Sequence, residues 1–288
     1  MSAEPASLFT QASLDGRTRA AVIRRHDLTP EVVASIEDSA RSLGLSFVDA
    51  AVRLGIVCQA DVEAALGSEQ RIAVVQRKRV VPHRSLTILR DPFDPHSEAV
   101  RALRTELILR RDSHTHANLV ALLSPCAGEG RSQLAAELAI AFSQLGQPTL
   151  LIDADLRRPK QHVLFNADNA HGLSDAISQA LTPALNPVEG LPELSVLTSG
   201  PIPPNPLELL CDGRFEKLVD EWRKRFAYIV FDTPPVDKYA DGLAVATLAA
   251  RALTVYRAAH TPYAETRNLL RRLTATHSNI LGAVVNHF

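Results

Sequence analysis

The stretch "SPCAGEGRSQL", residues 124–134, has the form of a phosphate-binding loop with two substitutions. The usual loop pattern is G-x-x-x-x-G-K-[ST]. In this chain Arg131 follows Gly130 where the pattern has lysine, and Pro125 holds the place of the first glycine. The motif alone therefore fits either a nucleotide site or a glycine-containing turn. The surrounding sequence distinguishes the two.

The neighbouring segments favour a nucleotide site. An apolar run at 118–123 precedes the loop, and a helical pattern at 132–145 follows it. This is the context that a phosphate loop needs, because free N–H groups and the dipole at a helix N-terminus attract anions. Ser132 is placed to ligate magnesium, as in other phosphate loops. The residues expected to bind the nucleotide here are Ala127, Gly128, Glu129, Gly130, Arg131, Ser132 and Gln133.

The rest of the C-terminal two thirds alternates between short apolar runs and helical stretches. Apolar runs with little alternation suit strands that are buried on both faces of a parallel sheet. This order predicts a doubly wound α/β domain of the P-loop NTPase type. The expected strands lie at 118–123, 149–153, 194–198, 228–232, 252–256 and 280–286, and the clearest helices at 132–145, 214–225, 240–250 and 262–276.

Three aspartates end two of these predicted strands. Asp153 and Asp155 close "LLIDADLRRP", and Asp232 closes "YIVFD". In a doubly wound sheet the carboxyl ends of the strands converge on one crevice. Carboxylates, waters and phosphates are the ligands that magnesium prefers, so the three side chains form a candidate magnesium site facing the loop. The competing interpretation is that they cap strands at solvated turns.

The N-terminal third has a different, helical pattern. In "LTPEVVASIEDSARSLG", Thr29 precedes Pro30 as a helix N-cap and Gly44 marks the helix end. Two shorter amphipathic segments follow, "SFVDAAVRLG" and "CQADVEAALGSEQ". Pro82, Pro92 and Pro95 then interrupt a basic segment. We therefore expect a flexible arm at 1–20, a small all-helical docking module at 21–72, a linker at 73–97 and the P-loop domain at 98–288.

Composition limits the classes of partner. The net charge is −1, so bulk attraction to nucleic acid is not expected. Residues 71–111 carry ten Lys/Arg against four Asp/Glu, which fits either a solvated linker and helix or a docking surface for an acidic partner or lipid. Three cysteines without metal or disulfide spacing indicate a reducing cytosol. No signal peptide or apolar run of about 18 residues is present, so we expect an intracellular chain that does not span a membrane by itself.

Further motifs make the chain similar to a known family over about residues 90–288. They are "SPCAGEGRS", "LLIDADLRRP", "GLSD" at 172–175, "LTSGPIPPNPLELL" at 197–210, "YIVFDTPP" with Asp241 after it, and "GAVVN" at 282–286. Together they resemble the bacterial tyrosine kinases (BY-kinases) of capsule and exopolysaccharide export. The resemblance implies a cytoplasmic ATP- and Mg²⁺-dependent protein-tyrosine kinase that works with a membrane polysaccharide co-polymerase, peripheral to the inner membrane through that partner.

The resemblance also implies roles for single residues. Arg131 and the loop amides would bind the phosphates, and Ser132 and Asp153 would hold magnesium. Asp155 would lie near the acceptor hydroxyl as base or orienter, and Asp232 would hold a metal-bound water. Asn286 of "GAVVN" is a further expected nucleotide-binding residue. In the family an E-x-x-R-x-x-R helix builds a ring of subunits, and the residues that match it are Glu98, Arg101 and Arg104.

The helical module resembles the N-terminal modules of type II secretion ATPases. With "GEGRS", it resembles the kinase-like subgroup associated with chain-length determinants in exosortase-linked exopolysaccharide systems, which also carries arginine in the lysine position. Some modules of this type bind cyclic di-GMP. Ser46-Phe47-Val48 stands where those modules begin with R-L-G, so plain protein docking is favoured over cyclic di-GMP.

One departure from the family bears on the activity. The family's C-terminal tyrosine cluster has no counterpart, because the chain ends at "VVNHF" and its tyrosines, at 228, 239, 256 and 263, are scattered. We therefore expect kinase activity to act on another protein. Two alternatives stay open: an ATP-binding scaffold that regulates the exporter without tyrosine phosphorylation, and a MinD/ParA-type positioning ATPase. The second is disfavoured because Cys126 stands where those proteins have another lysine.

Overall fold

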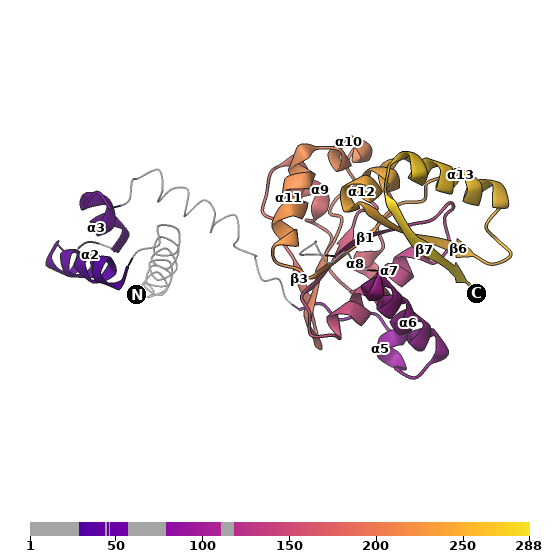
Figure 1. Ribbon diagram of the computed structural model, residues 1–288, viewed down its shortest axis with the longest axis horizontal. Coiled ribbons are helices and arrows are strands. Elements are labelled where there is room, and N and C mark those ends of the chain that lie inside the picture. Colours follow the sequence, from indigo (N-terminus) through magenta and orange to yellow (C-terminus); the bar gives the residue numbers. More distant parts are fainter. Residues whose placement is uncertain (1–28, 44, 46, 57–78, 111–117) are drawn as a thin grey trace, which may run out of the picture. The chain divides into compact units, whose positions relative to one another are not determined.

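A computed structural model describes residues 29–43, 45, 47–56, 79–110 and 118–288 (Figure 1). The contacts within the chain separate two units, Met1–Ala73 and Val74–Phe288.

The described part of the first unit consists of two helices. α2 spans Pro30–Leu43 and α3 spans Phe47–Arg53. They pack through Ile36, Ala50 and Ala51, whose side chains are fully buried. The first helix begins directly after Thr29, as the sequence predicts. The expected arm at 1–20, the glycine expected to end α2 and the expected helix after residue 57 lie outside the described residues.

The second unit is built on a seven-stranded sheet with the order β3-β4-β2-β5-β1-β6-β7. Every neighbouring pair is parallel except β3 and β4, which are antiparallel. The predicted doubly wound α/β fold is therefore confirmed. The strands are β1 Asn118–Leu123, β2 Thr149–Asp153, β3 Asn186–Val188, β4 Leu191–Leu197, β5 Tyr228–Asp232, β6 Arg251–Arg257 and β7 Asn279–Asn286.

Helices cover both faces of this sheet. One hydrophobic core lies under α9 to α13, and the other lies under α5 to α8. Among the described residues, no helix is both long and apolar enough to cross a membrane. The helices are α5 Thr87–Arg90, α6 Pro95–Leu109, α7 Arg131–Ser143, α8 Gln161–Leu164, α9 Leu173–Ser178, α10 Pro206–Leu210, α11 Gly213–Arg223, α12 Asp241–Ala249 and α13 Tyr263–Ala275.

Strand β1 shows why the apolar runs alternate so little. Leu119, Ala121 and Leu123 point into one core, and Val120 and Leu122 point into the other. Because side chains of a strand alternate between the faces of its sheet, a strand covered on both faces has to be apolar throughout. The position of β1 between β5 and β6 places the loop that follows it next to the end of β5, the middle strand of the sheet.

The segment expected to be a linker differs from the prediction. Val80 pairs with Val188 of β3, and Leu86 and Ile88 are fully buried in the core under α7. The segment contains prolines, but it still packs on the domain because its apolar side chains cover one face of α7. At least residues 79–97 therefore belong to the α/β unit.

Candidate active site

The loop between β1 and α7 is shaped by two glycines in the left-handed region. Gly128 has φ 79° and Gly130 has φ 84°, a conformation that side chains disfavour. Gly130 also caps α7 without any side chain bonding to the first turn of the helix. The first N–H groups of a helix have no intrahelical partner, so those of α7 remain available to an anion. This is the geometry that the motif predicted.

Two residues expected to bind the nucleotide hold the loop in shape. Glu129 is 1% exposed, and its carboxylate accepts hydrogen bonds from the Cys126 amide, at 2.8 Å, and from the Thr261 hydroxyl. The Asn286 amide donates to the Glu129 carbonyl at 2.7 Å. A Cβ on Gly130 would lie 2.5 Å from the same amide nitrogen. Glu129 and Asn286 therefore brace the loop from the side of β6 and β7.

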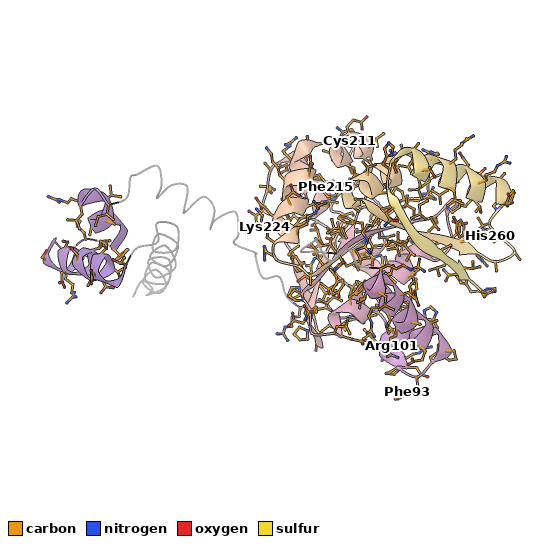
Figure 2. All side chains as sticks on the ribbon, viewed as in Figure 1. Phe93, Arg101, Cys211, Phe215, Lys224 and His260 are labelled. Atoms are coloured by element: carbon orange, nitrogen blue, oxygen red, sulfur yellow. The ribbon has the colours of Figure 1, made fainter. Side chains whose placement is uncertain are left out.

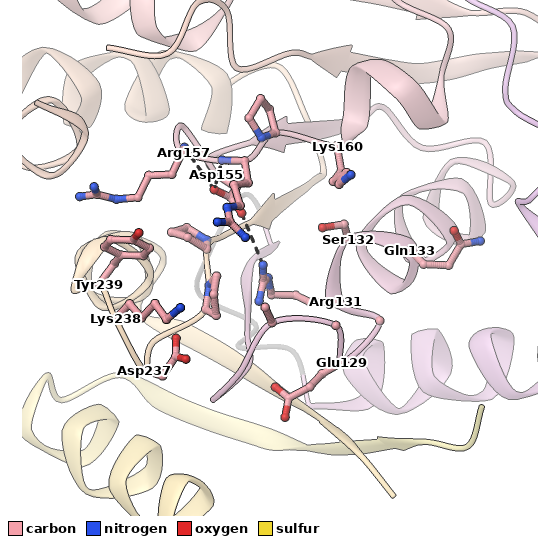
Figure 3. A pocket seen from close by; sticks show the side chains of 17 residues that line it. Glu129, Arg131, Ser132, Gln133, Asp155, Arg157, Lys160, Asp237, Lys238 and Tyr239 are labelled. Carbon is pink, nitrogen blue, oxygen red and sulfur yellow. Dashed lines mark hydrogen bonds and ion pairs between the residues drawn. The ribbon is translucent and has the colours of Figure 1, made fainter. Parts of the chain in front are cut away.

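The amide of Gln133, a third expected nucleotide ligand, is also engaged elsewhere. It donates to the Ser85 carbonyl at 2.8 Å and to Glu137 at 2.9 Å, and Figure 3 shows the side chain directed away from Arg131. Gln133 nevertheless lines one cavity with the other expected ligands of the loop, Ala127, Gly128, Glu129, Gly130, Arg131 and Ser132.

The predicted carboxylates meet at the ends of their strands. Asp153 and Asp232 are directly paired between β2 and β5, and both are fully buried. Asp155, two residues after the end of β2, is 4% exposed. Burial, followed by the charge of Asp232, raises the pKa of Asp153 well above its usual range. Burial also raises the pKa of Asp232, although Arg131 and hydrogen bonds from Gln161 and Ser132 oppose the shift.

Arg131 is the cation of this cluster. Its Nε lies 3.4 Å from Oδ1 of Asp232, and its Nη2 lies 3.6 Å from Oδ2 of Asp155. Its Nη1 donates to the hydroxyl of Ser124. The guanidinium thus lies beneath the loop and contacts two carboxylates at once, which the compact ammonium of lysine is less suited to do. One positive charge faces three buried carboxyl groups.

Asp153 also shapes the turn that follows it. Its Oδ2 accepts the amides of Lys160, at 3.0 Å, and Gln161, at 2.9 Å, and its Oδ1 accepts the amide of Asp155 at 3.3 Å. This carboxylate, like that of Asp232, is not in the cavity wall. Its position in the structure supports a role behind the site, where it fixes the turn at 155–161.

That turn delivers Gln161, a site residue that sequence reasoning missed. Its Nε2 donates to Asp232 Oδ2 at 2.8 Å and to the Ser132 carbonyl at 3.0 Å. Its Oε1 is buried and has no hydrogen-bond partner among the described residues. An unpaired buried carbonyl costs free energy, so this oxygen is suited to a donor that enters the site. No motif marks Gln161, because the backbone turn alone brings it to Asp232.

The cavity in front of the loop has a volume of about 510 Å³ and a basic rim. Arg157, Arg158, Lys160 and Lys238 line it together with Asp155. Figure 3 shows Arg157 and Lys160 on either side of Asp155. Three of these cations follow Asp155 in "DLRRPK". This basic run is the sequence feature that could have identified the rim.

Arg157 is the most firmly held of the rim cations. It forms two hydrogen bonds with Asp241, at 3.0 and 3.3 Å, and its guanidinium lies 4.0 Å from the ring centre of Tyr239. Asp241 is almost fully buried, so Arg157 partly neutralises it.

The residues present fit both a polyphosphate and magnesium. The free amides of α7 and the basic rim suit phosphates. Ser132, which hydrogen-bonds Asp232, the Asp232 carboxylate and the unpaired Gln161 oxygen suit a hydrated divalent cation. Such a cation would also offset the excess negative charge of the three carboxylates.

The predicted oligomerisation residues lie on α6 and contribute nothing to the cavity wall. Arg101 (Figure 2) forms an ion pair with Glu98 at 2.6 Å, one helical turn away. Arg104 donates to the carbonyl of Ala141 on α7 at 3.0 Å. The structure thus brings these residues together on one helix and connects that helix to α7.

A phosphate loop between a central parallel strand and a buried helix, with aspartates at adjacent strand ends, defines a P-loop NTPase domain. Comparison with known proteins gives the family. No family model matches the chain. Tyrosine-protein kinase YwqD of Bacillus subtilis is 34% identical over 205 residues, which are 70% of this chain and 86% of YwqD. The chain therefore belongs to the bacterial tyrosine kinase family.

Two further comparisons agree with this assignment. The kinase domain of Escherichia coli tyrosine kinase ETK has a TM-score of 0.67 and 31% identity, and the match covers 74% of this chain and 82% of that domain. Tyrosine-protein kinase ptk of Acinetobacter johnsonii is 30% identical over 220 residues, which are 76% of this chain and 29% of ptk. Family membership argues against the positioning-ATPase alternative.

Proposed function

We propose that the α/β unit is an Mg-ATP-dependent protein-tyrosine kinase that acts with a membrane polysaccharide co-polymerase in exopolysaccharide export. The observation that carries the proposal is the charge of the site. Asp153, Asp155 and Asp232 are buried together with Arg131 as their cation, beside the start of α7, whose first amides have no intrahelical partner. Magnesium would supply positive charge to the three carboxylates, and the phosphates of the nucleotide would supply negative charge to the amides at the start of α7.

Each residue has a task in this proposal. The amides at the start of α7 and the rim cations bind and orient the phosphates. Ser132 and Asp232 hold magnesium, which would neutralise phosphate charge, and Asp153 supports them from behind. Asp155 lines the cavity and is the group that would take the proton of an acceptor hydroxyl. Positioning and electrostatic stabilisation account for most of the catalysis in phosphoryl transfer.

The second part of the proposal concerns assembly. Glu98, Arg101 and Arg104 share α6, and the Arg104 contact with Ala141 links this helix to the helix that begins at the phosphate loop. We propose that subunits form a ring through α6. The unit that contains α2 and α3 would dock a protein partner at the cytoplasmic face of the inner membrane, with cyclic di-GMP as the less favoured ligand.

A catalytically weak scaffold is the second candidate, and Arg131 is the observation that favours it. Its guanidinium is turned onto Asp155 and Asp232, so part of its charge is not directed at the phosphates. In this candidate, ATP would drive assembly without phosphorylation of tyrosine.

One assay separates the two candidates. The full chain is incubated with Mg-ATP and the cytoplasmic segment of the co-encoded polysaccharide co-polymerase, and phosphotyrosine on that segment is measured. Its appearance, and its loss in Ser132→Ala, supports the kinase. ATP-dependent assembly without phosphotyrosine supports the scaffold. Failure to bind ATP would contradict both.

A further inference from the structure

Tyr239 lies in the wall of the cavity, between β5 and α12. It is partly exposed, and Figure 3 shows it next to Lys238 and Arg157, on the far side of Asp155 from Ser132. Asp155, the proposed proton acceptor, lines the same cavity. We propose that Tyr239 is a phosphoryl acceptor of its own kinase domain. This inference rests on the proposed kinase function.

The other three tyrosines of the chain do not have this placement. Tyr228 and Tyr256 lie in β5 and β6 and are 6% and 8% exposed, and Tyr228 stacks on Phe142 at 4.2 Å. Tyr263 is 78% exposed at the start of α13 and is not in the cavity wall. Burial therefore keeps two tyrosines from any phosphate donor, and position separates Tyr263 from the site.

Tyr239 is also held in place. The guanidinium of Arg157 lies 4.0 Å from the centre of its ring, and the two hydrogen bonds to buried Asp241 fix that guanidinium. A cation over an aromatic face is attracted by the negative charge of the ring's π-system, so this contact holds the ring in place. Arg157 lies two residues after Asp155, so one short segment carries both the proposed proton acceptor and the group that positions the tyrosine.

The chemistry is that of ordinary phosphoryl transfer. The Tyr239 hydroxyl oxygen attacks the γ-phosphorus of ATP, and an O–P bond forms as the bond from the γ-phosphorus to the β,γ-bridging oxygen breaks. ADP leaves with that bonding electron pair, and the phenolic proton passes to the carboxylate of Asp155. No oxidant or other co-reactant is needed. A tyrosine of the same chain is present at high effective concentration, so the reaction has no association step.

The product would change the charge of the site. A phosphotyrosine carries about −1.5 to −2 charge at neutral pH. Next to Lys238 and Arg157 it would find cations already on the rim, and it would compete with Asp241 for Arg157. Phosphorylation would therefore loosen the Arg157–Asp241 pair and leave the rim less basic, which weakens binding of a second nucleotide.

The test uses the full-length chain with Mg-ATP and mass spectrometry of its peptides. We expect phosphotyrosine at Tyr239 and its loss in Tyr239→Phe, a variant that keeps the ring under Arg157. Tyr263→Phe is the matched control and should keep the modification at Tyr239. The initial rate per molecule should not change across a dilution series, because donor and acceptor share one chain.

The outcomes separate this inference from the proposed function. A random glutamate–tyrosine copolymer serves as an external acceptor in parallel. If the copolymer is phosphorylated while Tyr239 stays unmodified, the inference is wrong and the kinase proposal stands. A rate per molecule that falls on dilution also contradicts it, because transfer then occurs between chains. If neither the copolymer nor the chain is phosphorylated and ATP does not bind, both proposals fail.

Discussion

Arg131 and Asp232 meet beneath the phosphate loop, with Nε of the arginine 3.4 Å from Oδ1 of the aspartate, although the two residues lie 101 positions apart. The same guanidinium reaches Asp155 at 3.6 Å. Arginine in the lysine position is therefore part of the carboxylate cluster. Its planar fork suits two acidic partners, whereas lysine offers a point charge.

Replacing Arg131 tests this arrangement. Loss of a charged hydrogen bond costs about 1.5–3 kcal/mol, so Arg131→Ala should lower the rate of phosphoryl transfer by about one to two orders of magnitude. Arg131→Lys should retain nucleotide binding. Arg271→Ala, on the exposed face of α13, is the control. Steady-state kinetics give the result, and full activity of Arg131→Ala would remove this residue from the mechanism.

Replacing Gly130 by alanine tests whether the shape of the loop matters, and Gly190→Ala is the matched control. Both have positive φ, 84° and 75°, but a Cβ would meet Asn286 at 2.5 Å only at Gly130 and has open space at Gly190. The left-handed conformation costs each alanine variant about 1–2 kcal/mol. Gly130→Ala should lose more stability in urea unfolding and should lose nucleotide binding as well. Equal behaviour of the two variants would show that the contact with Asn286 does not matter.

The raised pKa of Asp153 predicts how the free energy of unfolding depends on pH in the absence of magnesium. Its pKa is raised in the folded chain, so the folded state binds this proton more tightly than the unfolded state. The stabilisation is complete below the unfolded pKa, about 3.9, and is lost as pH rises through the folded pKa. Asp153→Asn carries no such charge, so its stability relative to the natural chain should increase with pH.

Urea unfolding in a chelator, at a series of pH values, measures that difference. Asp220→Asn is the control, because Asp220 lies on α11 and pairs with Arg223 away from the cavity. A difference between Asp153→Asn and the natural chain that does not vary with pH would contradict the assignment. Added magnesium should reduce the difference at neutral pH by neutralising the cluster.

The ring proposal predicts a change of oligomeric state. Arg101→Ala combined with Arg104→Ala should shift the chain toward the monomer in sedimentation velocity. Since Arg104 also contacts Ala141, thermal unfolding has to show that the variant is folded. Arg267→Ala with Arg271→Ala, on α13, is the matched pair. Unchanged sedimentation of the α6 variant would refute assembly through this helix.

Much of the fold could be predicted because the buried strands have distinctive runs. All six predicted strands are present, and Asp153 and Asp232 meet because parallel strands end at one edge. β3 was missed because Asn186–Val188 is three residues long, contains proline and pairs antiparallel at the sheet edge. Such a short strand has no hydrophobic periodicity of its own, and it forms because it pairs with β4.

The missed site residues depend on tertiary contacts. Gln161 reaches Asp232 through a turn that the Asp153 carboxylate holds, and no local pattern encodes that turn. The pairing of Arg157 with Tyr239 joins segments more than 80 residues apart. Glu129 fits the loop motif, but its side chain is buried against Cys126 and Thr261, which the motif does not reveal.

Nucleotide titration calorimetry with and without magnesium tests the central claim most directly. The full chain should bind ATP tightly with Mg²⁺ and much more weakly in a chelator. Ser132→Ala and Asp232→Asn should lose most of the magnesium-dependent gain, while Tyr263→Phe should bind like the natural chain. Equal ATP affinity with and without magnesium, unchanged in both site variants, would contradict the account.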